Sequence, residues 1–204
     1  IVEMARRLGL DWTYAHPRDV FAEMAQAMPS LANITWERLL RENSVTYPCP
    51  APDAPGVDIV FHDQFPTADG RARLVPAGPS DPAEIPDADY PFVLTTGREL
   101  EHWHTGTMTR RVGVLDALEP AATVSLAPAD FRRLGIAPGG WVRVTTRRGT
   151  LQCASREDPG LPEGIAFLPF AFREAAANLL TDPRLDPEGR IPGFKLCAAR
   201  LEPA

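Results

Sequence analysis

The clearest constraint on the fold is a pair of alternating runs between residues 140 and 155. Val142 and Val144 alternate with polar or bulky residues, and the chain returns through Cys153 in the same way. A period of two is typical of a strand that buries one face. Arg148-Gly149 separates the two runs, and glycine at this place favours a turn. The sequence therefore predicts two neighbouring strands joined by a turn.

Four further short apolar runs lie in the same part of the chain, at residues 91–96, 121–126, 165–168 and 194–201. A short helix is expected over 128–135, because Pro128 stands near its start and Gly135 after its end. A second short helix is expected over 174–180. Six short strands with two brief helices favour a small β-barrel.

Residues 1–45 carry helical periodicity instead. A first helix ends at Gly9, a second begins at Pro17, and Thr35 is placed to cap a third. His16, beside Pro17, suits a cap or turn better than a ligand role. The first pattern starts in mid-helix without an initiator Met, so we expect a fragment of a longer protein, its helices packing partly on a body outside this chain.

Residues 46–90 form a Pro-rich connection between this helical segment and the compact domain expected at 91–204. A connection of this length is usually a linker or functional. Within it, 59–61 and 72–75 could be two short strands, with Asp69-Gly70 as the turn between them. We therefore predict a helical segment, an irregular connection with a possible hairpin, and a barrel.

The formal charge of -6 is unevenly distributed. Residues 1–90 hold 7 Lys and Arg against 14 Asp and Glu, whereas residues 91–204 hold 14 against 13. A nucleic-acid surface needs a clear basic excess, so we expect no nucleic-acid partner. Arginine-rich but nearly neutral composition fits a pocket for phosphate groups better.

The three cysteines, Cys49, Cys153 and Cys197, are far apart and odd in number. They show no CxxC spacing, so we expect reduced and mostly buried thiols, not a disulfide framework or a cluster motif. No apolar run approaches the length of a membrane span, and the first residues lack a signal-peptide pattern. We expect a cytoplasmic protein without a membrane partner.

The stretch TTGRELEHWHTGTMTRR, at residues 95–111, is a poor core sequence. Gly97 and Gly106 let a backbone approach a ligand closely, and Arg98, Arg110 and Arg111 can make bidentate bonds to phosphate. The composition suits a loop that binds an anionic, oxygen-rich ligand. A solvated loop is the alternative that composition alone leaves open.

Three blocks resemble the C-terminal cofactor-binding domain of the molybdenum or tungsten bis-pterin oxidoreductases, most closely the formate dehydrogenase catalytic subunit. They are the 95–111 stretch, LGIAPGGWVRVTTRRGTLQ at 134–152, and PFAFREAAANLLTDPRLDPEGRIPGFKLCAARLEP at 169–203. The resemblance implies a mixed α and β fold: a six-stranded double-psi β-barrel preceded by a short helical and irregular segment.

The resemblance also implies a set of cofactor-binding residues, with no catalytic residue and no metal ligand in this chain. The set is Thr96, Gly97, Arg98, Glu99, His102, His104, Thr105, Asn178, Phe194 and Lys195. Arg98 and nearby amides would hold a diphosphate. Asn178 would offer its amide to a pterin or guanine edge, or else cap a helix.

His102 and His104 are spaced so that both rings would face one side of a strand. A two-histidine metal site is possible, but a third ligand is not evident. A neutral imidazole that donates to a pterin or phosphate oxygen needs no such partner and agrees with the resemblance. Phe167, Phe170 and Phe172 are expected in the core, and for Phe194 a core role is the alternative.

The implied function is formate oxidation to carbon dioxide at a bis(molybdopterin guanine dinucleotide) centre with Mo or W. The iron-sulfur clusters and the metal-ligating residue would lie upstream, so this chain alone is expected to be inactive. Expected partners are upstream domains of the same subunit and electron-transfer subunits. Another bis-pterin oxidoreductase, such as a nitrate reductase, and a stand-alone double-psi barrel binding module remain alternatives.

Overall fold

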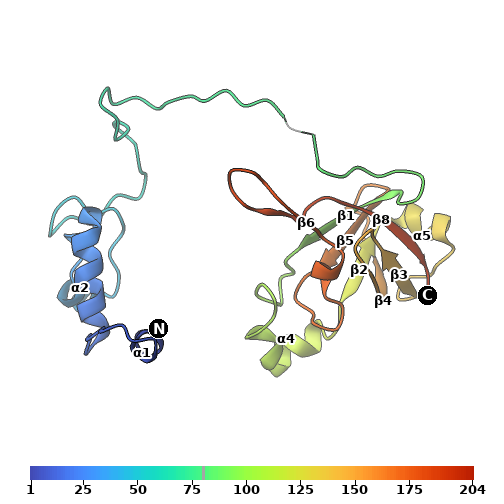
Figure 1. Cartoon of the computed structure of the whole chain (residues 1–204), viewed down its shortest axis with the longest axis horizontal. Coiled ribbons are helices and arrows are strands. Elements are labelled where there is room, and N and C mark those ends of the chain that lie inside the picture. The colour runs from blue at the N-terminus through green and yellow to red at the C-terminus, as the bar shows by residue number, and fades with distance from the viewer. Residues whose placement is uncertain (80) are drawn as a thin grey trace. The chain divides into compact units, whose positions relative to one another are not determined.

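The computed structural model of the chain describes residues 1–79 and 81–204. They form two compact units, Ile1–Ala77 and Gly78–Ala204, and the second holds the barrel (Figure 1). Among the described residues, no helix is long and apolar enough to cross a membrane.

The first unit contains the three helices that the periodicity predicts: α1 (Val2–Arg7), α2 (Pro17–Ala27) and α3 (Trp36–Glu42), with a 3-10 turn, η1, at Pro29–Leu31. His16 caps α2, because its Nδ1 accepts from the backbone N–H of Arg18 at 3.1 Å. Thr35 caps α3 through an equivalent bond from the N–H of Arg38. The cap assignments are confirmed.

The predicted hairpin at 59–61 and 72–75 is wrong. Both stretches are bends, turns or irregular chain. Their apolar side chains have no sheet or core to cover, and Leu74 is 90% exposed. The turn at Gly70 does exist, since its N–H donates to the Thr67 carbonyl at 3.0 Å. A turn alone does not hold two strands together when neither strand can bury an apolar face.

Six strands of the second unit close into a barrel. They are β1 (Phe92–Gly97), β2 (Thr123–Leu126), β3 (Trp141–Thr145), β4 (Thr150–Glu157), β5 (Ile165–Pro169) and β8 (Cys197–Pro203), in the order β1-β5-β2-β4-β3-β8. The β1–β5 and β2–β4 pairs are parallel and the others antiparallel. The predicted closed, six-stranded barrel is confirmed.

The barrel interior holds the apolar residues whose alternation predicts the strands. Leu94, Val124, Val142, Val144 and Leu168 are fully buried there. Helix α5 (Pro128–Leu134) ends as predicted at Gly135, which takes the left-handed conformation that favours glycine (φ 66°). All three cysteines are buried and free of disulfide bonds, as predicted.

Two predicted boundaries differ from the structure. The last strand begins at Cys197 instead of residue 194, and the expected helix over 174–180 is only a 3-10 turn, η3, at Ala177–Leu179. The sequence also failed to predict η2 (Thr109–Arg111), α4 (Gly113–Leu118) and the small β6–β7 hairpin (Asp182–Leu185 with Pro192–Gly193). In Figure 1, α4 lies on the opposite side of the barrel from α5.

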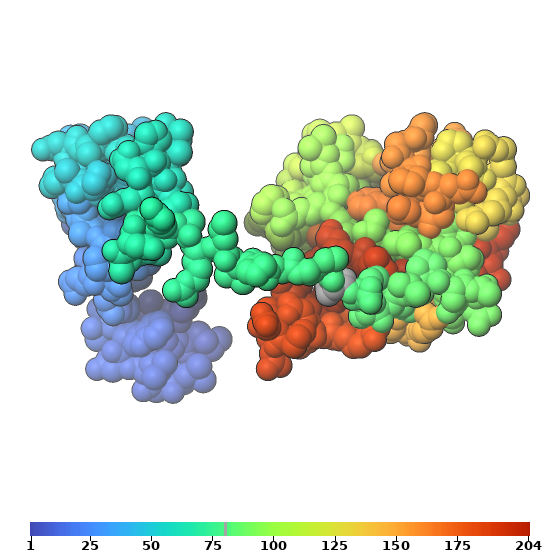
Figure 2. Space-filling view, turned by 90° about the horizontal axis from the view of Figure 1, so that it is seen from above, coloured from blue at the N-terminus to red at the C-terminus, as the bar shows by residue number. Residues whose placement is uncertain are grey.

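The strand register brings three segments to one end of the barrel. Gly97 pairs with Pro169 at the ends of the parallel strands β1 and β5, so the loops that follow both strands leave the same edge. Strand β8 runs antiparallel to β1, with Cys197 opposite Leu94, so the residues before Cys197 reach that edge too. Figure 2 shows this red C-terminal surface beside the green surface of the β1 region.

Candidate functional site

The three segments surround an open cavity of about 560 Å³. Its lining residues are Thr96, Arg98, His104, Thr105, Phe170, Asn178, Phe194 and Lys195. All except Phe170 belong to the set of predicted site residues, which the sequence places as much as 99 positions apart. The structure therefore brings most of the predicted set together on one surface.

Two reciprocal bonds attach the segment before β8 to the end of β1. The Thr96 hydroxyl donates to the Phe194 carbonyl at 2.7 Å, and the Lys195 ammonium donates to the Thr96 carbonyl at 2.6 Å. Lys195 also lies over the Phe194 ring, with Nζ 5.2 Å from its centroid. These contacts explain why the final strand begins only at Cys197 and why both side chains line the cavity.

Arg98 and His104 also line the cavity and lie within hydrogen-bonding distance of each other, with Arg98 Nη2 2.9 Å from His104 Nε2. The guanidinium also stacks on Trp103, 5.0 Å from the ring centroid. His104 has a positive φ of 51°, which turns the chain so that its ring reaches the cavity. Arg98 is exposed and keeps further N–H groups for a ligand.

Asn178 comes from η3, the 3-10 turn after β5, and its exposed side chain lines the cavity. Phe170, directly after β5, is half-buried and lies beside His104, with ring centroids 6.4 Å apart. The prediction that Phe170 lies in the core is only partly right, because its ring packs on the core and also lines the cavity. Its position beside the end of β1, where its N–H donates to the Gly97 carbonyl at 3.1 Å, depends on strand pairing, which periodicity does not reveal.

Three predicted residues do not line the cavity. Gly97 is buried, and an added Cβ would be 2.7 Å from the Phe167 ring, so glycine is needed for close packing. His102 is buried, with Nε2 2.8 Å from the Glu119 carbonyl oxygen and its ring edge-on to Phe172. His102 and His104 thus have different surroundings, contrary to the strand-like spacing expected for them.

Glu99, the third of these residues, lies in the same 95–111 stretch and is partly buried. Its Oε1 atom is buried without a hydrogen-bond partner in the described part of the chain. Burial, followed by the nearby negative charge of Glu119, raises the pKa of the Glu99 carboxyl above its usual range. An unpaired, buried carboxyl oxygen can accept a bond from a ligand N–H group.

The other loop arginines have different positions. Arg110 is bound to Glu174 (2.7 Å) and Asp116 (3.3 Å) and lies over the Phe172 ring, so it anchors the loop. Arg111 is exposed on η2. Across residues 1–79 and 81–204, no group of three or more His, Cys, Asp or Glu side chains is arranged to hold a metal ion.

The cavity combines two cations, Arg98 and Lys195, with one amide, Asn178, and the rings of two phenylalanines and one histidine. Cations attract phosphate oxygens, an amide can pair with the edge of a heterocycle, and a ring can pack on its face. The cavity volume falls in the usual range of ligand sites. This donor set fits a ligand that carries both phosphates and a flat, hydrogen-bonding ring system.

The comparisons with known proteins agree with this chemistry. The closed six-stranded barrel defines the fold class of the second unit. Residues 92–198 match the Molydopterin dinucleotide binding domain family. The chain belongs to this family. Among solved structures, acetylene hydratase from Pelobacter acetylenicus is similar in fold, with a TM-score of 0.52 and 23% identity over 57% of this chain and 19% of that one. The predicted double-psi β-barrel is confirmed.

Curated relatives include the alpha subunit of F420-dependent formate dehydrogenase 1 from Methanococcus maripaludis, which is 39% identical over 90% of this chain. The catalytic subunit of an assimilatory nitrate reductase from Bacillus subtilis is 32% identical over 100% of the chain. The chain spans 27% and 30% of the length of these two relatives.

Proposed function

We propose that this chain is the cofactor-binding portion of a formate dehydrogenase-like catalytic subunit. The whole enzyme would oxidise formate to carbon dioxide at a bis(molybdopterin guanine dinucleotide) centre that holds molybdenum or tungsten. The observation that carries the proposal is the meeting of Arg98, Asn178 and Lys195, from three separate segments, around one cavity in a chain of this family.

In this proposal the chain binds and orients one dinucleotide. Arg98 and Lys195 hold phosphate oxygens, Asn178 pairs with the edge of a pterin or guanine ring, and Phe170 and Phe194 pack against flat ring surfaces. The bound metal-pterin group supplies the electron-transfer chemistry, and the protein supplies binding, orientation and charge.

Glu99 and His102 have secondary roles in this scheme. Because Glu99 does not line the cavity, the loop would have to move before its buried Oε1 could accept a ligand N–H. His102 supports the loop through its contacts with Glu119 and Phe172 and does not touch the ligand.

Formate is the proposed substrate because the formate dehydrogenase relative shares more identity with this chain than the nitrate reductase does. A nitrate reductase-like enzyme is the second candidate, favoured by the match of that relative over the whole chain.

We further propose that the iron-sulfur clusters and the metal ligand lie in other domains of the same subunit. Electron-transfer subunits are the proposed partners, and the proposed location is cytoplasmic.

The test uses the full-length subunit, purified from a host that makes the cofactor. Molybdenum, tungsten, pterin and guanine nucleotide are measured per chain, and formate-dependent reduction of a viologen dye is followed on the same sample. We expect the subunit to contain molybdenum or tungsten and two guanines per chain, and to reduce the dye when formate is added.

A cofactor-loaded subunit that reduces nitrate and ignores formate would favour the second candidate. A subunit that contains no pterin and no guanine nucleotide would overturn the proposal for the cavity. The compartment is tested separately, by cell fractionation with an antibody against this domain.

A further inference from the structure

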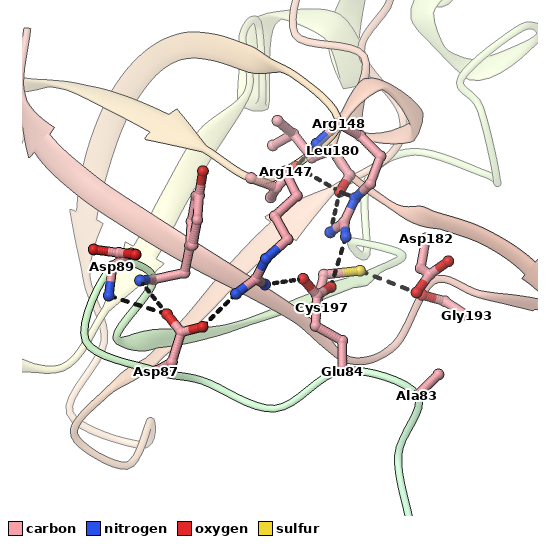
Figure 3. A network of polar contacts seen from close by, with 12 residues as sticks. Ala83, Glu84, Asp87, Asp89, Arg147, Arg148, Leu180, Asp182, Gly193 and Cys197 are labelled. Carbon is pink, nitrogen blue, oxygen red and sulfur yellow. Dashed lines mark hydrogen bonds and ion pairs between the residues drawn. The ribbon is translucent and has the colours of Figure 1, made fainter.

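The carbonyl oxygen of Leu180 receives three hydrogen bonds from the turn between β3 and β4. Thr146 Oγ1 donates to it at 2.9 Å, and Arg148 donates with Nη2 at 3.0 Å and with Nε at 3.2 Å. Figure 3 shows the Arg148 guanidinium reaching this oxygen. A guanidinium fork, in which two N–H groups of one arginine donate to the same carbonyl oxygen, makes a strong and directional contact.

The same guanidinium is held from its other side by Glu84. Arg148 Nη1 bonds to Glu84 Oε2 at 2.7 Å, and the second carboxylate oxygen accepts from Arg147. The Glu84 side chain is 6% exposed, so this carboxylate is buried between two arginines (Figure 3). A buried charge of this kind is tolerated only when it is paired, and the pairing fixes the orientation of Arg148.

Gly149 brings the two backbones into direct contact. An added Cβ on this residue would lie 2.7 Å from the Leu179 carbonyl oxygen. The β3–β4 turn therefore lies directly against the segment 177–181 that contains η3. Since η3 is a single 3-10 turn with few bonds of its own, its position depends on these outside contacts.

We propose that Arg148, oriented by Glu84, is a positioning residue for Asn178. Asn178 lies two residues before Leu180 and lines the cavity, whereas Arg148 is not among the lining residues. Fixing the Leu180 carbonyl fixes the turn and thereby the direction of the Asn178 amide. The proposal rests on the proposed function, because it assigns Arg148 an indirect effect on cofactor binding.

The central variant is Arg148→Lys, in the full-length subunit. It keeps a cation beside Glu84 but removes the fork to Leu180. Hydrogen–deuterium exchange of the 177–181 amides is measured, together with guanine nucleotide content and the thermal midpoint. We expect about tenfold faster exchange in this segment and reduced guanine content. Arg132→Lys, an exposed position on α5, is the matched control and should change neither.

Guanine content is then measured in the Asn178→Ala background. If Arg148 acts through Asn178, adding Arg148→Lys there should cause no further loss of guanine, because the two effects share one cause. Equal additional loss in that background would overturn the proposal. Unchanged exchange of residues 177–181 in the single variant would overturn it as well.

Glu84→Gln provides a second route if Arg148→Lys fails to fold. It leaves the fork in place but loosens its anchor, so we expect a smaller change in exchange in the same direction; no change would contradict the positioning role. A wild-type subunit without guanine nucleotide would refute the proposed function, while the exchange measurement would still decide whether Arg148 fixes the turn.

Discussion

Lys195 Nζ donates to the Thr96 carbonyl oxygen at 2.6 Å, across 99 residues of sequence. The Thr96 hydroxyl returns a bond to the neighbouring Phe194 carbonyl at 2.7 Å. This pair of contacts attaches the end of β1 to the segment before β8, and one wall of the cavity depends on it.

Thr96→Val tests this attachment. The substitution keeps the side-chain shape and removes the donor to the Phe194 carbonyl, so we expect a loss of about 1–2 kcal/mol in unfolding free energy. Urea denaturation measures it. Thr150→Val, at an exposed position on β4, is the control and should change stability by less than about 0.5 kcal/mol. Equal losses in both variants would contradict a special role for Thr96.

Arg98→Ala separates cofactor binding from folding. Arg98 is exposed, and its contacts are to His104 and Trp103 at the cavity wall. We expect cofactor affinity to fall about tenfold or more, since a charge-assisted bond is lost, while the thermal midpoint hardly moves. Arg111→Ala removes an exposed arginine of the same loop that does not line the cavity, and should retain cofactor. A similar cofactor loss in both variants would indicate only a general charge effect.

Gly106→Ala tests the shape of the loop between β1 and α4. Gly106 has a φ of 70°, and an added Cβ would lie 2.8 Å from the Ala171 carbonyl oxygen. We expect a destabilisation of about 1–3 kcal/mol, measured by chemical denaturation. At Gly113 an added Cβ meets no atom within 4 Å, so Gly113→Ala should be neutral or slightly stabilising. The prediction fails if Gly106→Ala is as stable as Gly113→Ala.

Asp182 should contribute to acid sensitivity. Hydrogen bonds from the Arg184 guanidinium lower the pKa of Asp182 to about 2, below the ordinary value of 3.8. A lowered folded-state pKa stabilises the protein above the unfolded-state pKa, and this stabilisation is lost as pH falls from about 4 toward 2. Asp182→Asn should therefore be less stable at pH 6, with a difference that shrinks between pH 4 and pH 2.

Urea denaturation at several pH values measures this difference. Arg184→Gln removes the guanidinium that lowers the Asp182 pKa, so it should weaken the same pH dependence without changing the carboxylate. A stability difference between wild type and Asp182→Asn that stays constant from pH 6 to pH 2 would contradict the assignment.

The barrel could be predicted because its strands carry their own local signal. Val142 and Val144 alternate with exposed residues, and both are fully buried inside the barrel. The alternating pattern does not reveal which strands pair. The double-psi type of the barrel followed from resemblance, and the order of its strands was not predicted. The position of Phe170 beside the end of β1 could be read only from the pairing of Gly97 with Pro169.

The site residues also divide into those whose position the sequence could predict and those whose position it could not. Arg98 and Asn178 were predicted to lie at the site because of their chemistry and the family pattern, and both line the cavity. The separation of His102 from His104 was not predictable, because the chain leaves β1 at Gly97 and the strand-like spacing no longer applies. Glu84 was also missed, since nothing in a Pro-rich connection distinguishes a buried carboxylate from a solvated one.

The most direct test of the central claim is the guanine nucleotide content of the full-length subunit, measured after acid release, for wild type and Asn178→Ala side by side. The account predicts two guanines per wild-type chain and a clear loss in the variant, with the thermal midpoint preserved because Asn178 is exposed. Equal guanine content in both proteins, or none in the wild type, would contradict the assignment of this cavity as the dinucleotide site.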